Sequence, residues 1–487
     1  MPSNTTRRDM LRSTACGFGS VALQAMLAGQ TSQGASARPD ASGTTSTAIS
    51  GDTLLPKNPM FAPRAKRIIF IFMQGGPSQV DTFDYKPELF ARDGQTIDFT
   101  GVRSGDFGKL TQRTLMKPMW DFAPHGQCGQ MVSTLFPHIA GHVDDLCFLH
   151  GMHTEGVAHG PSTLFLHTGA TNLVRPSMGA WLMYGLGTEN QDLPGFVTLQ
   201  PSDEKGGPRN YSNAFLPSVY QGTAIGRSWK PIDQMTIDHI RNPNLSAESS
   251  QTRFRLTQQL SQAQVNRRQV QDSQLESVIR SYELAFRMQT AAPVVMDMSG
   301  ETSATLDLYG IGDKPTDEFG RQCLLARRLS ESGVRFVQVN YADESPNPRW
   351  DQHSRMHKHA DHALATDKPV AGLLTDLKQR GLLEDTIVWW GGEFGRTPFN
   401  QSNDGRDHNP RGFSVFIAGG GVKPGFAWGS TDEIGHNAVE GRVHMHDLHA
   451  TLLHLLGLDH ERLTYRYDGR DFRLTDLAGH IVHDIIA

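Results

Sequence analysis

The chain has 487 residues, of which 38% are hydrophobic, so it can bury a large core, and its length allows two or three domains. The formal net charge is −5 with both signs interspersed, so the composition provides no basic surface of the kind that binds nucleic acid. Cysteine is scarce, and beyond Cys16 the three that remain, Cys128, Cys147 and Cys323, are an odd number that argues against a disulfide framework.

The first forty residues have the order of features found in an export signal. Paired arginines in TRRDMLR, residues 6–12, precede a modest apolar run, and a small-residue site at 35–37 follows. The apolar run is shorter than the roughly 20 residues that span a bilayer, and no later apolar segment reaches that length. Residues 1–37 resemble a twin-arginine signal peptide, which predicts export to the periplasm or the cell exterior and no integral membrane segment after signal removal. A chance arginine pair is the alternative.

Residues 38–63 are rich in Gly, Ser, Thr and Pro and are predicted to be a disordered spacer. Folded structure is predicted from residue 64, with a first buried strand at 68–73 that a Gly-Gly-Pro turn stops abruptly. Further strands are predicted at 333–341, 385–395 and 413–422, and helical patterns precede the first two of these. Alternating strands and helices favour an α/β fold with a mainly parallel central sheet and helices on both faces.

Polar side chains follow the predicted strands where ligands gather in such folds, at the carboxyl ends of the strands. Segments that are distant in sequence thereby bring carboxylates and imidazoles to one edge of the sheet. Mixed ligands of this kind suit zinc, manganese or iron, and a larger share of carboxylate favours calcium. We therefore expect one or two divalent metal ions there, with the identity left open. The expected ligands are Asp81, Asp351, His353, Glu393, Asp407 and His408.

The string WDQHSRMHKHADH, residues 350–362, holds four histidines and two aspartates. Asp351 and His353 fall in the loop after a predicted strand and are the expected ligands, with His357 a weaker candidate. His359 and His362 fall in a predicted helix. Because helical geometry prevents all these histidines from binding one ion, His359 and His362 are interpreted as helix-surface residues.

A second string, HTEGVAHGPSTLFLHTGATN at residues 153–172, resembles the nucleophile segment of sulfatases in the alkaline phosphatase superfamily. That segment reads Cys or Ser, any residue, Pro, Ser, Arg, and then a helical turn ending in Leu-Thr-Gly. HGPSTLFLHTG matches at its Pro, its Ser and its closing Thr and Gly. His159 stands at the nucleophile position and Thr163 at the Arg position, so the formylglycine modification of sulfatases is not expected.

The resemblance places His159 in the active site as a nucleophile, a metal ligand or a general acid, and a metal-activated water is the simplest alternative nucleophile. Ser162 and Thr163 are predicted to bind substrate, although both can equally be read as helix caps. Arg396 could hold an anionic group in bidentate fashion, or it could form a structural ion pair.

The carboxyl half resembles the same superfamily. Asp351 and His353 resemble one of its metal-binding Asp and His pairs, and His408 resembles the histidine that closes the site. Glu393 occupies a later strand end, but Phe394 follows where the superfamily has His. Residues 443–458 resemble the helix with which sulfatases finish the domain.

The chain is identified as a member of the domain-of-unknown-function 1501 family. The matching phrases are GGPSQVDTFDYKP, FGRQCLLARRLSESGVRFVQV, WDQH, GGEFGRTP, GRDHNP and AGGGVKPG, spread over most of the chain. Membership implies an alkaline phosphatase-like fold and a single domain over residues 64–487. A helical insertion is predicted around 246–290, packed by residues that include Leu256 and Leu260. Residues 199–222 are interpreted as an insertion near the edge of the sheet, and Trp389 and Trp390 as core.

Three functions are compatible with the sequence. The first is a secreted metal-dependent hydrolase of sulfate or phosphate esters, acting on a small anionic ester or a sulfated glycan. The second is a catalytically degenerate protein that binds metal or an anionic glycan without turnover, because the usual nucleophile is missing. The third is a secreted structural protein whose histidines only support folding. The sequence leaves the oligomeric state open.

Overall fold

The computed structural model describes residues 54–100, 110–238, 240–268 and 273–487, and the predicted signal peptide lies outside them. The described residues belong to one compact unit, Asp52–Ala487. Residues 54–63, which the sequence assigns to a disordered spacer, are packed on this unit. The amide of Lys57 donates to the carbonyl of Leu186, and that of Met60 donates to the carbonyl of Gly457. Ordered chain therefore begins before residue 64.

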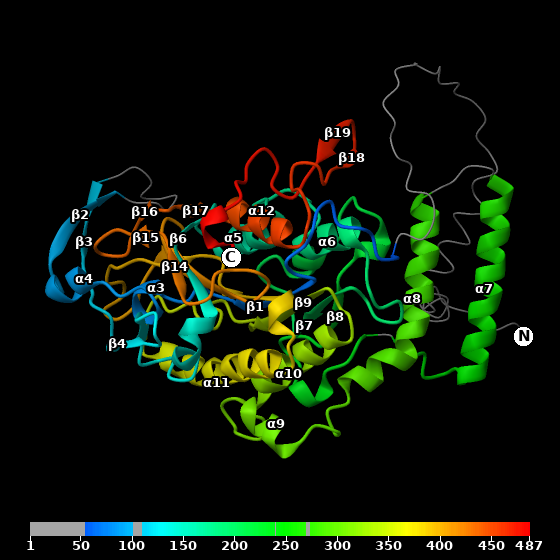
Figure 1. Cartoon of the computed structure of the whole chain (residues 1–487), viewed down its shortest axis with the longest axis horizontal. Coiled ribbons are helices and arrows are strands. Elements are labelled where there is room, and N and C mark those ends of the chain that lie inside the picture. Colours follow the sequence, from blue (N-terminus) through cyan, green and yellow to red (C-terminus); the bar gives the residue numbers. More distant parts are fainter. Residues whose placement is uncertain (1–53, 101–109, 239, 269–272) are drawn as a thin grey trace, which may run out of the picture. The chain divides into compact units, whose positions relative to one another are not determined.

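The centre of the fold is a nine-stranded sheet in the order β14-β6-β13-β10-β1-β9-β7-β8, with β17 also paired to β6 (Figure 1). β1 pairs in parallel with β10 on one side and with β9 on the other. β13 is antiparallel to both of its neighbours. The strands are β1 Arg67–Met73, β6 Leu146–His153, β7 Phe196–Leu199, β8 Thr223–Ile225, β9 Phe336–Tyr341, β10 Thr386–Gly391, β13 Phe413–Ala418, β14 Phe426–Trp428 and β17 Val443–His444.

All four strands expected from the sequence are present, which confirms the α/β class and the mainly parallel sheet. The fourth of them, β13, runs against its neighbours, so its Gly-rich end lies at the opposite edge from the ends of β1, β9 and β10. The carboxyl end of β13 therefore contributes nothing to the edge at which β1, β9 and β10 end.

The strands form because their apolar runs are buried on both faces of the sheet. Every residue of β1 and of β10 is buried. Trp389 stacks on Phe70 with ring centroids 3.8 Å apart, and Trp390 stacks on Phe416 at 5.1 Å. This confirms that both tryptophans belong to the core.

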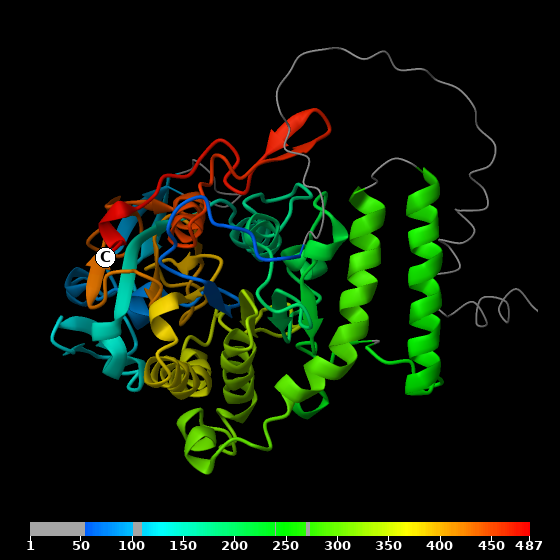
Figure 2. The same cartoon turned by 45° about the vertical axis from the view of Figure 1, so that its right-hand side comes forward.

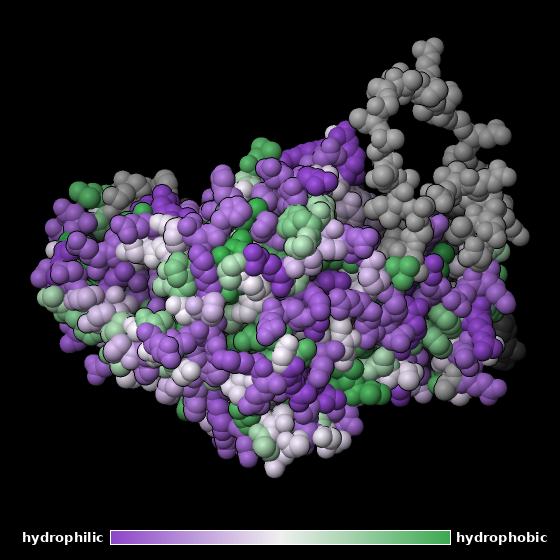
Figure 3. Space-filling view, in the orientation of Figure 1, coloured by the Kyte–Doolittle hydropathy of each residue, from purple (hydrophilic) through white to green (hydrophobic). Residues whose placement is uncertain are grey.

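Helices cover both faces of the sheet (Figure 1). On one face lie α10 (Asp317–Glu331) and α11 (Lys358–Gln379), and on the other lie α5 (His159–Thr168), α6 (Met178–Leu186) and α12 (Met445–Leu455). None of the helices in the described ranges combines the length and hydrophobicity needed to cross a membrane. The face seen in Figure 3 is mainly hydrophilic, with hydrophobic residues in scattered patches.

The smaller elements lie in connections and at the edges of the fold. The short helices are α3 Gln79–Thr82, α4 Pro87–Ala91 and α9 Ser303–Leu308. The remaining strands form two-stranded ribbons: β2 Thr96–Thr100 with β3 Leu110–Thr114, β4 Phe122–His125 with β5 Gln130–Ser133, β11 Gly395–Arg396 with β12 His408–Asn409, β15 Ser430–Thr431 with β16 Ala438–Glu440, and β18 Tyr465–Tyr467 with β19 Arg470–Phe472.

The predicted helical insertion consists of two helices, α7 (Ala247–Arg268) and α8 (Ser273–Met296), which lie side by side in Figures 1 and 2. Phe254 stacks on Phe286 between them, with ring centroids 4.1 Å apart. Leu256 and Leu260 are 55% and 63% exposed, so the expectation that they pack this insertion is wrong. The aromatic pair provides the contact instead.

Candidate metal centre

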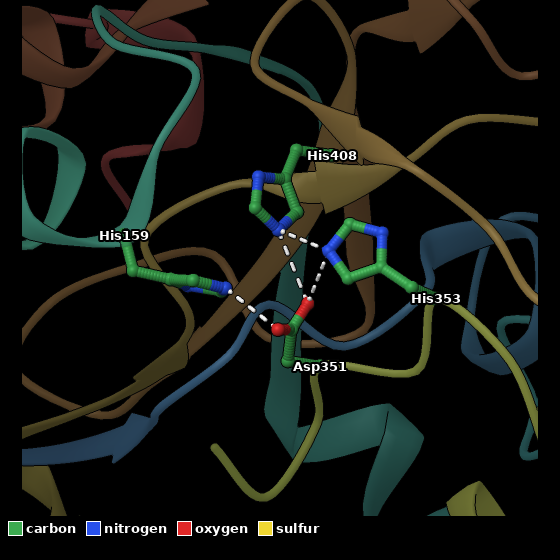
Figure 4. A group of neighbouring side chains, drawn as sticks. All are labelled: His159, Asp351, His353 and His408. Atoms are coloured by element: carbon green, nitrogen blue, oxygen red, sulfur yellow. Dashed lines mark hydrogen bonds and ion pairs between the residues drawn. The ribbon is translucent and has the colours of Figure 1, made fainter. Parts of the chain in front are cut away.

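Four side chains from three separate parts of the chain meet at the carboxyl edge of the sheet (Figure 4). Asp351 and His353 lie in the loop that follows β9, His159 is the first residue of α5, and His408 opens the short strand β12. One ligand atom from each of the four lies within 4.8 Å of the others, and the described part of the chain contains one such group. We call these four residues the metal-ligand cluster.

Gly75 allows the end of β1 to meet the loop that carries Asp351. Its φ is +106°, and a Cβ at this position would lie 2.8 Å from the backbone nitrogens of Trp350 and Asp351. A side chain here would therefore displace the loop. The close approach also lets the amide of Trp350 donate to the carbonyl of Gln74 over 3.1 Å, which fixes the loop beside the strand end.

The carboxylate of Asp351 is the centre of the cluster. Its Oδ1 lies 3.0 Å from Nε2 of His353 and 3.1 Å from Nε2 of His408, and the two Nε2 atoms are 3.1 Å apart. Its Oδ2 lies 3.1 Å from Nε2 of His159. The carboxylate therefore faces three imidazole nitrogens, two on one oxygen and one on the other.

The partners of the three Nδ1 atoms determine the tautomers of the rings. Nδ1 of His159 lies 2.6 Å from a carboxylate oxygen of Glu393, that of His353 lies 2.6 Å from the amide oxygen of Gln401, and that of His408 lies 2.8 Å from the carbonyl oxygen of Val157. All three partners are acceptors, so each Nδ1 carries the proton. In the neutral form of each ring, the lone pair of Nε2 then faces Asp351.

This arrangement fits a divalent metal ion. Three lone pairs and a carboxylate converge, and two Nε2 lone pairs 3.1 Å apart repel each other unless a cation lies between them. Neighbouring ligand atoms around a tetrahedral zinc lie roughly 3.3 Å apart, close to the spacing of Asp351 Oδ1, His353 Nε2 and His408 Nε2. Metal-binding histidines usually donate their other N–H to a carboxylate, amide or carbonyl oxygen, as all three rings do here.

The charges of the cluster support the same assignment. Burial disfavours charge on Asp351, but the three histidines that face it and the nearby Arg396 guanidinium hold its pKa well below its usual range. Burial lowers the pKa of His408 to about 3, so this ring is neutral at physiological pH. Burial also opposes charge on His159, yet the carboxylates of Asp351 and Glu393 outweigh it and raise its pKa. A metal ion would compete with a proton at that ring.

Glu393 and Arg396 support the metal-ligand cluster from behind. The carboxylate of Glu393 accepts from Nδ1 of His159 over 2.6 Å, and its two oxygens accept from the amide of Gly75 over 3.0 and 3.1 Å. Arg396 is fully buried and donates over 2.8 Å to Oδ1 of Asp351. Its other donors go to the carbonyls of Gly75, Gly76 and Arg406, so this side chain positions Asp351 and does not face a substrate.

The structure does not bring the other predicted site residues into the cluster. Asp81 is fully buried in an ion pair with Arg406, with 2.6 Å between Oδ2 and Nε. Asp407 lies at the margin, where its Oδ1 accepts from the amide of His408 and is 3.8 Å from Nδ1 of His353. Ser162 and Thr163 are both fully buried, and their hydroxyls have no hydrogen-bond partner among the described residues.

The later histidines of the string at 350–362 lie outside the cluster. His357 is exposed and lies 3.9 Å from Asp404. His359 is fully buried, which corrects its interpretation as a surface residue. Its Nε2 accepts from the amide of Ser78, and its ring meets that of Trp350 edge-on. His362 is half-buried, and its Nδ1 lies 3.0 Å from the hydroxyl of Tyr341.

Two supporting groups were not predicted. Gln401, which fixes His353, lies in a polar turn segment that reads as an ordinary loop. Val157 fixes His408 through its backbone carbonyl, a group that every residue carries. Neither has a sequence signal that could have identified it.

A family model described as "Protein of unknown function (DUF1501)" matches residues 65–486. The chain belongs to this family. The matched range includes the whole metal-ligand cluster of this DUF1501 protein and its supporting residues. A search of curated proteins found no match to the sequence.

Solved structures of low sequence identity also resemble the DUF1501 chain. The lipoteichoic acid synthase LtaP from Listeria monocytogenes is 11% identical over 84% of this chain and 74% of its own, with a TM-score of 0.35. The PsFucS1 sulfatase from Pseudoalteromonas sp. is 13% identical over 81% and 68%, with a TM-score of 0.36. A protein of the alkaline phosphatase superfamily from Vibrio parahaemolyticus is 11% identical over 85% and 72%, with a TM-score of 0.33. Likeness at this level carries no argument about activity.

Replacing Glu393 by Gln tests whether His159 belongs to the cluster. Gln has the same size, but its amide N–H would face one of the two groups that donate to Glu393, Nδ1 of His159 or the amide of Gly75. Since such supporting groups typically contribute about 10- to 100-fold to metal affinity, we expect zinc affinity to fall by that factor. Competition with a chromophoric chelator would measure it, with the exposed Glu433→Gln as control. Unchanged affinity would remove His159 from the ligand set.

Proposed function

We propose that this DUF1501 protein is a secreted, metal-dependent hydrolase of sulfate or phosphate esters. The observation that carries the proposal is the convergence of three Nε2 lone pairs on one buried carboxylate at the carboxyl edge of an α/β sheet. Ligands bind at this edge in open α/β folds. The proposal covers one or two divalent ions, which can be zinc, manganese, iron or calcium.

A divalent ion bound there would neutralise the charge of an ester and stabilise the charge that develops during in-line displacement. The chain's own residues prepare for this role. Asp351, His353 and His408 would hold the ion, and Arg396 keeps the carboxylate of Asp351 ionised and in place. Glu393 orients the ring of His159, which lies on the second oxygen of Asp351 and is placed better as a ligand than as a nucleophile.

A second candidate is a protein that binds metal or an anionic glycan without turnover. Burial of the Ser162 and Thr163 hydroxyls favours it, because these are the side chains next to His159 in sequence that could otherwise attack an ester. A hydrolase built in this way would depend on water as its nucleophile.

Hydrolysis of model esters separates these two functions. The protein, loaded in turn with zinc, manganese, iron and calcium, would be assayed on para-nitrophenyl sulfate, para-nitrophenyl phosphate and bis-para-nitrophenyl phosphate. We expect at least one ester to be cleaved, and we expect chelation or His408→Ala to reduce the rate to background because both remove the bound ion. The exposed His480→Ala should keep the full rate. Metal binding with every ester intact would support the second candidate instead.

The secreted location is part of the proposal and rests on the sequence of residues 1–37. Replacing the paired Arg7 and Arg8 by lysine should block export through the twin-arginine route, which is sensitive to this pair. Cell fractionation would then show unprocessed protein in the cytoplasm, whereas wild type appears outside it. Equal export of both proteins would contradict the twin-arginine assignment.

A further inference from the structure

A small polar pocket lies at the same edge of the sheet as the metal-ligand cluster. It is lined by Gln74 after β1, by Gln338 and Asn340 on β9, by Ser202 after β7 and by Asn210 in the short helical turn Gly207–Tyr211. None of the residues that line it carries a charge. The hollow is small, of a size that takes one water molecule or one hydroxyl group.

The hydrogen bonds around Gln338 fix the orientation of its amide. Nδ1 of His167 lies 2.7 Å from the carbonyl of Thr163 and so carries the proton, which makes Nε2 of that ring an acceptor. The amide nitrogen of Gln338 donates to this Nε2 over 2.9 Å and to Oδ1 of Asn340 over 2.7 Å. Asn340 is fixed in turn, because its amide nitrogen donates to the carbonyl of Leu199.

The amide oxygen of Gln338 consequently receives no hydrogen bond. Gln338 is 98% buried, and its Oε1 has no hydrogen-bond partner among the described residues. Asn210 is half-buried, and its Oδ1 also has no hydrogen-bond partner among the described residues, while its amide nitrogen donates to the carbonyl of Lys205 over 3.2 Å. A buried acceptor without a donor is unfavourable, and Gln338 and Asn210 both line this pocket, so a donor is expected there.

The two buried unpartnered atoms favour a donor over an anion. A sulfate or phosphate oxygen needs N–H or O–H donors, whereas these two atoms are both acceptors. The hydroxyl of Ser202 already donates to the carbonyl of Asp343 over 3.2 Å. A neutral hydroxyl fits, because it can donate to one of the two oxygens and is of the right size.

The pocket and the metal-ligand cluster share two elements of the fold. The end of β1 supplies Gln74 to the pocket and the next residue, Gly75, to the support of Glu393 and thereby of His159. Helix α5 begins with His159 and carries His167, which orients Gln338, two turns later. The two sites are therefore built on the same strand end and the same helix.

We propose that this pocket binds a hydroxyl group of the substrate, and hence that the substrate is an ester of a sugar or a similar polyhydroxylated alcohol. The role of the pocket in binding a substrate rests on the proposed hydrolytic function. Binding of a hydroxyl group in the pocket does not require turnover. The pocket takes the neutral part of the molecule, and the metal-ligand cluster takes the anionic part.

Binding of neutral sugars tests the inference without relying on hydrolysis. Saturation-transfer NMR would be recorded on the metal-loaded protein with galactose, fucose, glucose and glycerol as separate probes. We expect at least one sugar to bind, and we expect Asn210→Ala and Gln338→Met each to weaken it, by up to about tenfold for the loss of one hydrogen bond. The exposed Asn244→Ala serves as a matched control, and melting temperatures would show whether each variant is folded.

The outcomes separate this inference from the proposed function. Sugar binding that depends on Asn210 and Gln338 supports the inference even if no ester is cleaved. Failure of all four probes to bind, or binding that survives unchanged in folded Asn210→Ala and Gln338→Met, overturns it and leaves the pocket as a site for a structural water. Binding that disappears only in His408→Ala would place the sugar at the cluster and also overturn it.

Discussion

The site depends on one buried carboxylate, that of Asp351, and on the lone pairs of three imidazoles that face it. Nδ1 of each imidazole faces a separate acceptor, so in the neutral rings all three Nε2 atoms face Asp351 with lone pairs. Such an arrangement is costly in a protein interior unless a cation joins it, because like lone pairs repel and buried polar atoms need partners. A bound metal ion removes both costs.

The surrounding fold brings these groups together and keeps them in place. Parallel strands β1, β9 and β10 end at one edge, and the ribbon of β11 and β12 sets Arg396 opposite His408. Because Gly75 has no Cβ, the backbone of the loop that carries Asp351 can lie against the chain just after β1. The same edge carries the polar pocket, so the two proposed binding sites lie on the same sheet.

Much of this was accessible from the sequence, because buried strands are uninterrupted apolar runs and strand ends are where ligands gather. Asp351, His353 and His408 were found in this way, and His159 through its motif. The assignment of Glu393 and Asp407 could not be resolved, because strand-end position does not distinguish a ligand from the group that orients a ligand. Burial of His359 was missed because helix periodicity places residues on a face but does not show what covers that face. Partners such as Gln401 depend on contacts between segments that only the folded chain defines.

The most direct test of the account is metal content by elemental mass spectrometry, on protein purified without a His tag or chelating resin. Wild type should contain stoichiometric divalent metal, and both Asp351→Ala and His408→Ala should lose it, whereas the exposed His357→Ala should retain it. Wild-type protein that holds no divalent metal, and takes none up from zinc, manganese, iron or calcium, would contradict the central claim. The converging lone pairs would then have to be relieved by protonation of the cluster.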